Sequence, residues 1–204
     1  MNKIKLNIAC GSRPLSGYIN LDMDSLSKLK KRYPNKKFSK NIVLKNWNVF
    51  KLPLKDNSVS IINSDAFIEH LSFLEEPKFF KEMVRVIKPG GKIKLSTVDF
   101  EKTVKDWLKA EDKWLDFYRD DKQAIKDQHW FGTYTYDYKN RWGYIAATLF
   151  GSQNGAGQYH KNCYTKKKLR SMCNFLNLKV LSIEGFRWHG NKDHMIKIIA
   201  EKKR

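Results

Sequence analysis

The chain has 204 residues, the size of one ordinary domain, and it is 41% hydrophobic and 30% charged. This balance supplies apolar side chains for a core and excludes a chain that is disordered by composition. No apolar run approaches the ~18 residues of a membrane-spanning helix, and Lys3 and Lys5 interrupt the apolar stretch that a signal peptide requires. The three cysteines contain no Cys-x-x-Cys pair. We therefore expect a cytoplasmic protein with neither a disulfide framework nor a metal site.

Basic residues outnumber acidic ones by 40 to 21, which gives a formal net charge of +19. The excess is concentrated between Asp24 and Asp56, where no acidic residue occurs. The basic residues of this interval are Lys28, Lys30, Lys31, Arg32, Lys36, Lys37, Lys40, Lys45, Lys51 and Lys55. Lysines on an edge strand prevent that edge from pairing with another chain, and we favour this interpretation. The alternative is a phosphate-binding surface whose partner is a nucleic acid.

The first half of the chain alternates between strand-like and helix-like patterns. The predicted strands are 4–10, 18–22, 41–47, 59–63 and 92–97, and the predicted helices are 24–33 and 75–87. Near the C-terminus, Thr165 caps a helix that is followed by two strands, 178–184 and 194–201, which most simply form an antiparallel pair. Strands that alternate with helices at this spacing predict an α/β fold with a doubly wound, mostly parallel sheet.

Aromatic residues are concentrated in one segment. Residues 101–160 hold 13 of the 27 aromatic side chains of the chain. We interpret this segment as a helical insert within a single domain of residues 1–204, because no linker, repeat or low-complexity tract divides the sequence. Two roles are open for the insert: a lid that binds a substrate, or a small helical cap whose rings pack against one another.

Three further segments point to a ligand site. Open α/β sheets bind ligands beyond the carboxyl ends of the strands, where the strand order reverses. Gly11 allows a tight turn directly after the first strand and a close approach of a ligand to the backbone. Asp22 closes the second strand, and its carboxylate can accept both hydroxyls of a ribose. Asn48 and Val49 offer a side-chain amide and a backbone N–H that suit the edge of a purine.

Several motifs occur in order along the chain. They are L-N-I-A-C-G-S-R-P-L-S-G-Y-I-N-L-D, L-P-L-K-D-N-S-V-S-I-I, A-F-I-E-H-L, R-V-I-K-P-G-G-K-I-K-L-S, L-F-G-S-Q and Y-H-K-N-C-Y-T-K-K-K-L. Through them the chain resembles the class I S-adenosylmethionine-dependent methyltransferases of the methyltransferase-11-like group, over most of residues 4–99 and 149–201. The last two motifs resemble a late signature of one bacterial and viral subgroup. The resemblance implies a Rossmann-like sheet of seven strands with an antiparallel C-terminal pair, and S-adenosylmethionine as cofactor.

The resemblance implies roles for the first turn and the second strand. Ala9, Cys10 and Gly11 would lie beside the methionine part of the cofactor. Ala9 stands where relatives carry glycine, and its methyl group is tolerated if its φ stays negative. Asp22 would hold the ribose, with Asp24 as its close competitor, although either residue can instead cap a helix.

The resemblance also implies contacts further along the chain. Asn48 stands where many relatives carry Asp, and it would accept a hydrogen bond from the adenine amino group, next to Val49. Asp65 and Ala66 would end the fourth strand beside the cofactor. Asp65 would attract the methionine ammonium or the sulfonium.

Candidates for a general base lie in three different segments. Such a base matters only when the methyl acceptor is a hydroxyl or a protonated amine. The candidates are Asp99 just past the fifth strand, His129 in the aromatic insert, and His160 in the late signature. For Glu69 and His70 of the E-H-L motif we expect a structural hydrogen bond rather than catalysis.

Three functions are open at this point. The leading hypothesis is a methyltransferase that transfers the methyl group of S-adenosylmethionine to a small-molecule or carbohydrate-type acceptor by in-line displacement. The second uses the basic 28–55 surface to methylate RNA, and a salt-insensitive or absent RNA interaction would exclude it. The third is a catalytically degenerate methyltransferase fold that binds a partner, and binding of S-adenosylmethionine would exclude it. The oligomeric state is not predicted.

Overall fold

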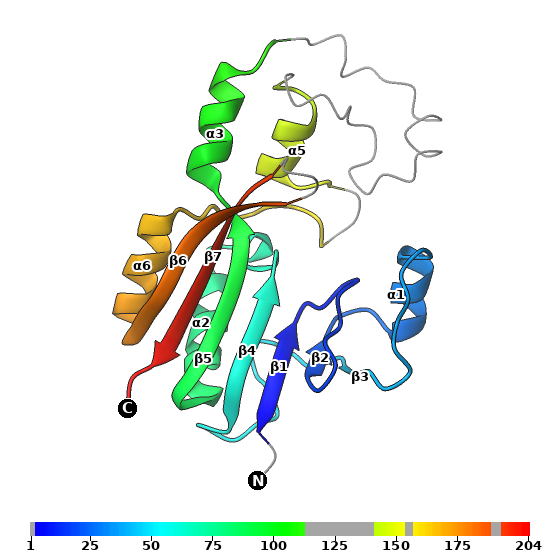
Figure 1. Cartoon of the computed structure of the whole chain (residues 1–204), viewed down its shortest axis with the longest axis vertical. Helices are drawn as coiled ribbons and strands as arrows, with labels where there is room; N and C mark the ends of the chain where they lie inside the picture. The colour runs from blue at the N-terminus through cyan, green and yellow to red at the C-terminus, as the bar shows by residue number, and fades with distance from the viewer. Residues whose placement is uncertain (1–2, 113–140, 154–156, 189–192) are drawn as a thin grey trace.

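The computed structural model describes residues 3–112, 141–153, 157–188 and 193–204. Within these residues the strands form one sheet in the order β3-β2-β1-β4-β5-β7-β6 (Figure 1). The strands are β1 (Ile4–Ile8), β2 (Ile19–Leu21), β3 (Val43–Lys45), β4 (Val59–Asp65), β5 (Ile87–Val98), β6 (Leu178–Trp188) and β7 (Asp193–Lys202). The first five strands are parallel, and β7 runs antiparallel to both β5 and β6. The predicted fold class and the predicted antiparallel C-terminal pair are confirmed.

Several strand boundaries differ from the sequence-based expectation, among them those of β1, β5 and β6. β1 ends at Ile8 rather than at residue 10, because Ala9 turns the chain with a φ of +52°. β5 begins at Ile87, so that the Pro-Gly-Gly segment lies within the strand rather than before it. β6 continues past Gly185 to Trp188, where it still pairs with β7.

One face of the sheet is apolar and carries the core. Leu6, Ile62 and Ile93 lie in register on β1, β4 and β5 and are buried. The helices α2 (Glu75–Val86) and α6 (Lys166–Phe175) both pack on this face (Figure 1). Helix α2 contributes buried side chains at helical spacing. These are Phe79, Phe80, Met83 and Val86. Burial of apolar area at about 25 cal/mol per Å² makes this layer the main source of stability.

The opposite face of the sheet is polar. Asn7, Asn63 and Lys94 are neighbours in register on β1, β4 and β5, and the exposed Lys92 and Lys197 share this face with them. The connection between β1 and β2, residues 9–18, contains no helix. This segment itself covers Asn7, whose side-chain amide donates to the carbonyl of Arg13.

Two buried asparagines hold the β1–β2 connection in place. Asn20 is 0% exposed and Asn7 is 3% exposed. The side-chain amide of Asn7 donates to the side-chain oxygen of Asn20 (2.8 Å) and to the backbone carbonyl of Arg13 (3.0 Å). Asn20 also accepts the N–H of Leu15 (2.7 Å) and donates to its carbonyl (3.0 Å). These bonds satisfy loop backbone groups that would otherwise be buried without partners.

The remaining helices are α1 (Leu26–Arg32), the short 3-10 helix η1 (Ile68–His70), α3 (Phe100–Lys109) and α5 (Tyr144–Phe150). Helices α3 and α5 lie together beyond one end of the sheet (Figure 1). Where the insert is described, the rings of Trp107 and Trp142 contact each other edge to face, with centroids 5.9 Å apart. This contact supports the helical-cap interpretation for that pair. Among the described helices, none is long and apolar enough to cross a membrane.

The basic residues between positions 28 and 55 are all exposed to solvent. The interval includes β3, which is the edge strand of the sheet. Arg32 forms an ion pair with Asp24 at 2.7 Å. The edge-protection interpretation requires basic residues on an edge strand, and Lys45 of β3 meets this requirement. Nucleic-acid binding by the same residues stays a prediction.

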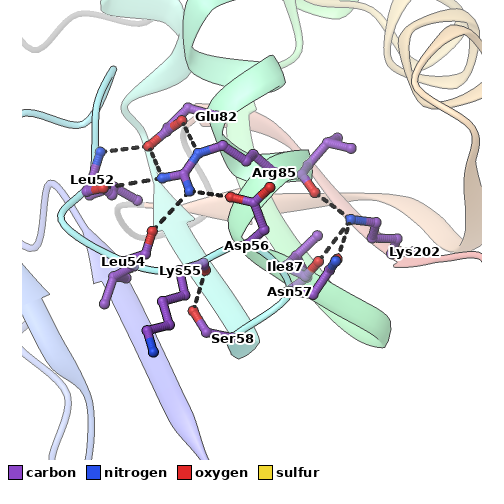
Figure 2. Close-up of polar contacts among 11 residues, drawn as sticks. Leu52, Leu54, Lys55, Asp56, Asn57, Ser58, Glu82, Arg85, Ile87 and Lys202 are labelled. Carbon is purple, nitrogen blue, oxygen red and sulfur yellow. Dashed lines mark hydrogen bonds and ion pairs between the residues drawn. The ribbon is translucent and has the colours of Figure 1, made fainter.

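Arg85 of α2 ties the segment before β4 to the helix (Figure 2). Its guanidinium donates to both carboxylate oxygens of Glu82 (2.8 and 2.7 Å) and to Asp56 (2.6 Å). It also donates to the carbonyls of Leu52 (3.1 Å) and Leu54 (2.8 Å). Glu82 is only 8% exposed, and the hydrogen bonds of Arg85 lower the pKa of its carboxyl. Arginine is needed here because its planar fork can make all of these bonds at once.

We expect Arg85→Ala to destabilise the fold by about 3 kcal/mol, because it leaves the carboxylate of Glu82 buried without its cation. Arg85→Lys keeps the charge but loses the fork, and it should recover less than half of that loss. The free energy of unfolding in urea measures both effects. The control is Lys105→Ala, which removes an exposed pair with Glu101 (2.6 Å) and should leave the free energy of unfolding nearly unchanged. Equal losses for the two alanine variants would contradict this account.

Candidate functional site

The strand order of the sheet reverses between β1 and β4. From β1 the chain proceeds outward to β2 and β3, and from β4 it proceeds the other way to β5. The turns that leave β1 and β4 both contain residues with positive φ: Ala9 (+52°) and Gly11 (+49°) after β1, and Ala66 (+49°) after β4. Parallel strands with opposite crossovers leave a crevice beyond their carboxyl ends. The predicted cofactor residues of these two turns are therefore next to each other in the fold.

Asp22 lies at the end of β2 and points toward the turn after β1. One of its carboxylate oxygens accepts the backbone N–H of Gly11 at 2.8 Å, and the other accepts the N–H of Asp24 at 3.0 Å. A carboxylate oxygen can accept two hydrogen bonds, so the oxygen bonded to Asp24 keeps the capacity for one more, whereas the oxygen bonded to Gly11 also accepts a weak hydrogen bond from the Cys10 thiol at 3.9 Å. Asp22 thus meets the requirement for binding a vicinal diol, whereas Asp24 is engaged with Arg32.

The condition under which the methyl group of Ala9 would be tolerated, a negative φ, is not met. The φ of Ala9 is +52°, in the left-handed region that glycine adopts readily and other residues adopt at a cost of about 1–2 kcal/mol. Cys10 donates its backbone N–H to Leu21 and accepts that of Arg13 through its carbonyl (2.8 Å). These two bonds fix the turn, and with it the conformation of Ala9.

Asn48 and Asp65 lie at the surface. The side-chain oxygen of Asn48 accepts the N–H of Phe50 at 2.9 Å and so forms a local turn. The oxygen keeps one lone pair and the NH2 group is free to donate, so the expected role of Asn48 as an acceptor toward adenine stays a prediction. Asp65 accepts the hydroxyl of Ser96 at 2.7 Å. The backbone N–H of Ala66 donates to Ser96 as well (2.9 Å), and so Ser96 fixes both residues at the end of β4.

The three candidate bases have different surroundings. Asp99 is buried and caps α3, since its side chain accepts the N–H of Lys102 at 3.2 Å. His160 has a ring Nδ1 that is 2.9 Å from the carbonyl of Thr148. Burial, together with the neighbouring His70, lowers the pKa of His160 to about 3, which makes it a weak base. His129 lies outside the described residues.

The E-H-L motif and the late Y-H-K-N-C-Y-T signature dock on each other. The carbonyl of Glu69 accepts the N–H groups of Lys161 (2.8 Å) and Asn162 (3.0 Å), and His70 Nδ1 is 2.9 Å from the carbonyl of Tyr159. The structural role expected for Glu69 and His70 is thus observed in these bonds. Burial raises the pKa of the Glu69 carboxyl to about 7. This burial could not be predicted from the sequence, because Glu is ordinarily an exposed residue.

One contact at the end of the sheet that carries the candidate site was also not predicted from the sequence. The guanidinium of Arg13, in the turn after β1, lies 3.8 Å from the ring centroid of Trp188 at the end of β6. Such a cation–π contact is worth about 0.5–1 kcal/mol at an exposed site. It could not be anticipated, since β6 was expected to end four residues before Trp188. The contact brings the last residue of β6 to the rim of the candidate site.

We expect Ala9→Gly to stabilise the protein by about 0.5–1 kcal/mol, because it relieves the left-handed strain at some cost in chain entropy. Thermal unfolding measures the gain. Ala66→Gly, at a φ of +49°, should behave in the same way. Ala110→Gly is the matched control, since Ala110 has a φ of −70° and only the entropic loss applies there. A loss of stability in Ala9→Gly would count against the strain.

We expect Cys10 to react slowly with thiol reagents. Burial and the nearby Asp22 raise the pKa of its thiol to about 12, so that about one thiol in ten thousand is ionised at pH 8. Cys163 is exposed and should be labelled first. Mass spectrometry after iodoacetamide treatment distinguishes the sites, and Cys163→Ser should remove the fast phase. Labelling of Cys10 as fast as that of Cys163 would show that the turn is open.

Comparisons with known proteins agree with this geometry. A family model described as a methyltransferase domain matches residues 8–95. A probable S-adenosylmethionine-dependent methyltransferase of Mycolicibacterium smegmatis is 33% identical over 81 residues, which are 39% of this chain and 28% of that relative. The match therefore covers less than a third of the relative's length.

Solved structures share the fold over the whole chain. A methyltransferase from Methanosarcina mazei has a TM-score of 0.58 at 18% identity and covers 100% of this chain and 94% of its own. The 1,6-didemethyltoxoflavin-N1-methyltransferase of Burkholderia thailandensis, solved with S-adenosylhomocysteine, has a TM-score of 0.56 at 9% identity, with 100% and 72% covered. The motifs, the strand order and the family match lead to one assignment: residues 8–95 match a methyltransferase domain, within a chain that has the fold of the class I S-adenosylmethionine-dependent methyltransferases.

Proposed function

We propose that the chain binds S-adenosylmethionine at the carboxyl ends of β1, β2 and β4 and transfers its methyl group to a small-molecule or carbohydrate-type acceptor. The observation that carries the proposal is the position of Asp22. Its carboxylate is oriented by the N–H groups of Gly11 and Asp24, and a ligand hydroxyl would compete on one of its oxygens with the weak thiol donor of Cys10 at 3.9 Å. A vicinal diol is the group that fits two such oxygens.

The residues around Asp22 fit a nucleoside cofactor. Gly11 has no side chain, and a Cβ built there would be in van der Waals contact with the hydroxyl of Tyr33 at 3.7 Å, so Tyr33 lies beside the turn. Asp65 places an exposed carboxylate at the end of β4, where a cationic amino-acid end of a ligand would be attracted. Asn48 and Val49 follow β3 on the far side of Asp22. The set thus spans a ligand with a positive end, a sugar and a base.

The chemistry asks little of the protein beyond positioning. The bound cofactor supplies a sulfonium methyl group, which an acceptor attacks in line. Alignment of the two reactants and exclusion of water provide most of the acceleration in such a displacement. Helices α3 and α5 and the 159–165 segment lie on the acceptor side of the site by topology, beyond the ends of β4 and β5 (Figure 1).

A small acceptor is supported by analogy of fold alone. The Burkholderia relative methylates 1,6-didemethyltoxoflavin, as its name states. A shared fold does not fix the substrate. An acceptor screen with S-adenosylmethionine that carries a labelled methyl group identifies the class, and RNA is one of its arms. Methylation of RNA that falls steeply with salt would replace the small-molecule proposal.

We expect calorimetry to show binding of both S-adenosylmethionine and S-adenosylhomocysteine to the wild-type chain. Asp22→Asn should weaken the affinity by about 10- to 100-fold, because it removes charge-assisted hydrogen bonds worth about 1.5–3 kcal/mol. Asp24→Asn, its neighbour in sequence, is the matched control and should leave the affinity nearly unchanged. The opposite order of the two variants would move the ribose site to Asp24. No binding by the wild type would leave the degenerate binding protein as the function.

A further inference from the structure

Two segments far apart in sequence build one cluster of side chains beyond the ends of β4 and β5. The docking of the 159–165 segment on η1 brings Glu69, His70 and His160 together. One carboxylate oxygen and one ring nitrogen from each histidine all lie within 4.8 Å of one another. The two imidazole rings contact each other edge to face, with their centroids 4.8 Å apart.

The hydrogen bonds of the two histidines fix which ring nitrogen is free. Nδ1 of His70 is 2.9 Å from the carbonyl of Tyr159, and Nδ1 of His160 is 2.9 Å from the carbonyl of Thr148. A carbonyl oxygen can only accept, so each Nδ1 carries the proton. In a neutral imidazole Nε2 then holds the lone pair. Histidines that bind metals are oriented by bonds of this kind from the second ring nitrogen.

Glu69 supplies an independent sign of a missing partner. Its side chain is 2% exposed, and its Oε2 accepts the hydroxyl of Thr97 at 2.9 Å. Its Oε1 is buried and has no hydrogen-bond donor among the described residues. A buried carboxylate oxygen without a partner is costly. A cation at the cluster would satisfy it.

We propose that Glu69, His70 and His160 bind one divalent transition-metal ion, which the sequence alone did not predict. Two imidazoles and one carboxylate suit Zn²⁺ and other first-row ions, whereas Mg²⁺ and Ca²⁺ prefer oxygen ligands. Bonds of about 2.0–2.1 Å in a tetrahedral site separate the ligand atoms by about 3.3 Å. The ligand atoms reach that spacing if rotations of the side chains bring them about 1–1.5 Å closer together.

The ion would act on the acceptor side of the site. Three protein ligands leave at least one coordination position open. An oxygen of the acceptor, from a hydroxyl or a carboxylate, is the natural ligand for it, because the ion polarises that oxygen and fixes its position. Glu69 follows the end of β4 by four residues. It lies close enough to Asp65 for an electrostatic interaction between the two carboxyl groups.

Metal titration of the metal-free protein tests the proposal without cofactor or acceptor. Calorimetry should show that one Zn²⁺ ion binds per chain. Addition of Co²⁺ should give the visible absorption bands of a four- or five-coordinate complex. Glu69→Gln and His160→Gln should each weaken binding by at least about 100-fold, since even residues that only orient a ligand contribute about 10- to 100-fold. The control is His194→Gln, which alters a histidine paired with Asp106.

Thr97 provides a second, graded test as a positioning residue. Thr97→Val removes the hydroxyl that orients Glu69 and should weaken Zn²⁺ binding by about 10-fold, and Thr97→Ser should restore it. A purely structural role of Thr97 would lower stability without a matching loss of Zn²⁺ affinity.

Binding below one ion per chain, or affinity that Glu69→Gln leaves unchanged, would overturn the proposal. Glu69→Gln decides the matter if His160→Gln does not fold, because glutamine keeps the shape of the side chain and can still accept from Thr97. The titration contains no S-adenosylmethionine, so it reads out the metal site even if the proposed cofactor site fails its own test.

Discussion

The hydrogen bond from the Gly11 N–H to the Asp22 carboxylate is the contact on which the site depends. It joins the turn after β1 to the end of β2, and the second oxygen of Asp22 holds the start of the next segment at Asp24. The strain of Ala9 at φ +52° persists because this bond and those of Cys10 over-determine the turn. The protein thus loses some folding stability to hold the geometry of the proposed ligand site.

The E-H-L motif and the late signature act as one structural unit. Tyr164 is buried, and its hydroxyl donates to Glu76 at 2.6 Å and to the carbonyl of Ile68 at 3.3 Å. Asn162 donates to the same Glu76 oxygen at 3.0 Å. These contacts explain why Glu69, Asn162 and Tyr164 are polar yet buried: they connect α2, η1 and the segment that carries His160. The catalytic or metal-binding potential of the cluster follows from that connection.

Periodicity was sufficient to predict the strands from 4 to 65, the amphipathic α2 and the closing β-hairpin, because each has a regular apolar pattern. The resemblance supplied the number of strands and the Rossmann-like class of the sheet. Features that depend on contacts between distant residues could not be predicted in this way. The sign of φ at Ala9 depends on Asp22 and Leu21, the burial of Glu69 depends on a segment about ninety residues later, and the end of β6 depends on its pairing with β7. The use of the Asn48 oxygen in a local turn was likewise invisible in the sequence.

The polar face of the sheet has a thermodynamic consequence. Because residues such as Lys92 and Lys197 stay hydrated in the folded state, unfolding exposes less new apolar surface than it would in a sheet that is covered by helices on both sides. The heat-capacity increment of unfolding scales with that newly exposed area. A smaller increment flattens the dependence of the folding free energy on temperature. The maximum stability of this chain would therefore be lower, and its fold would persist over a wider range of temperatures.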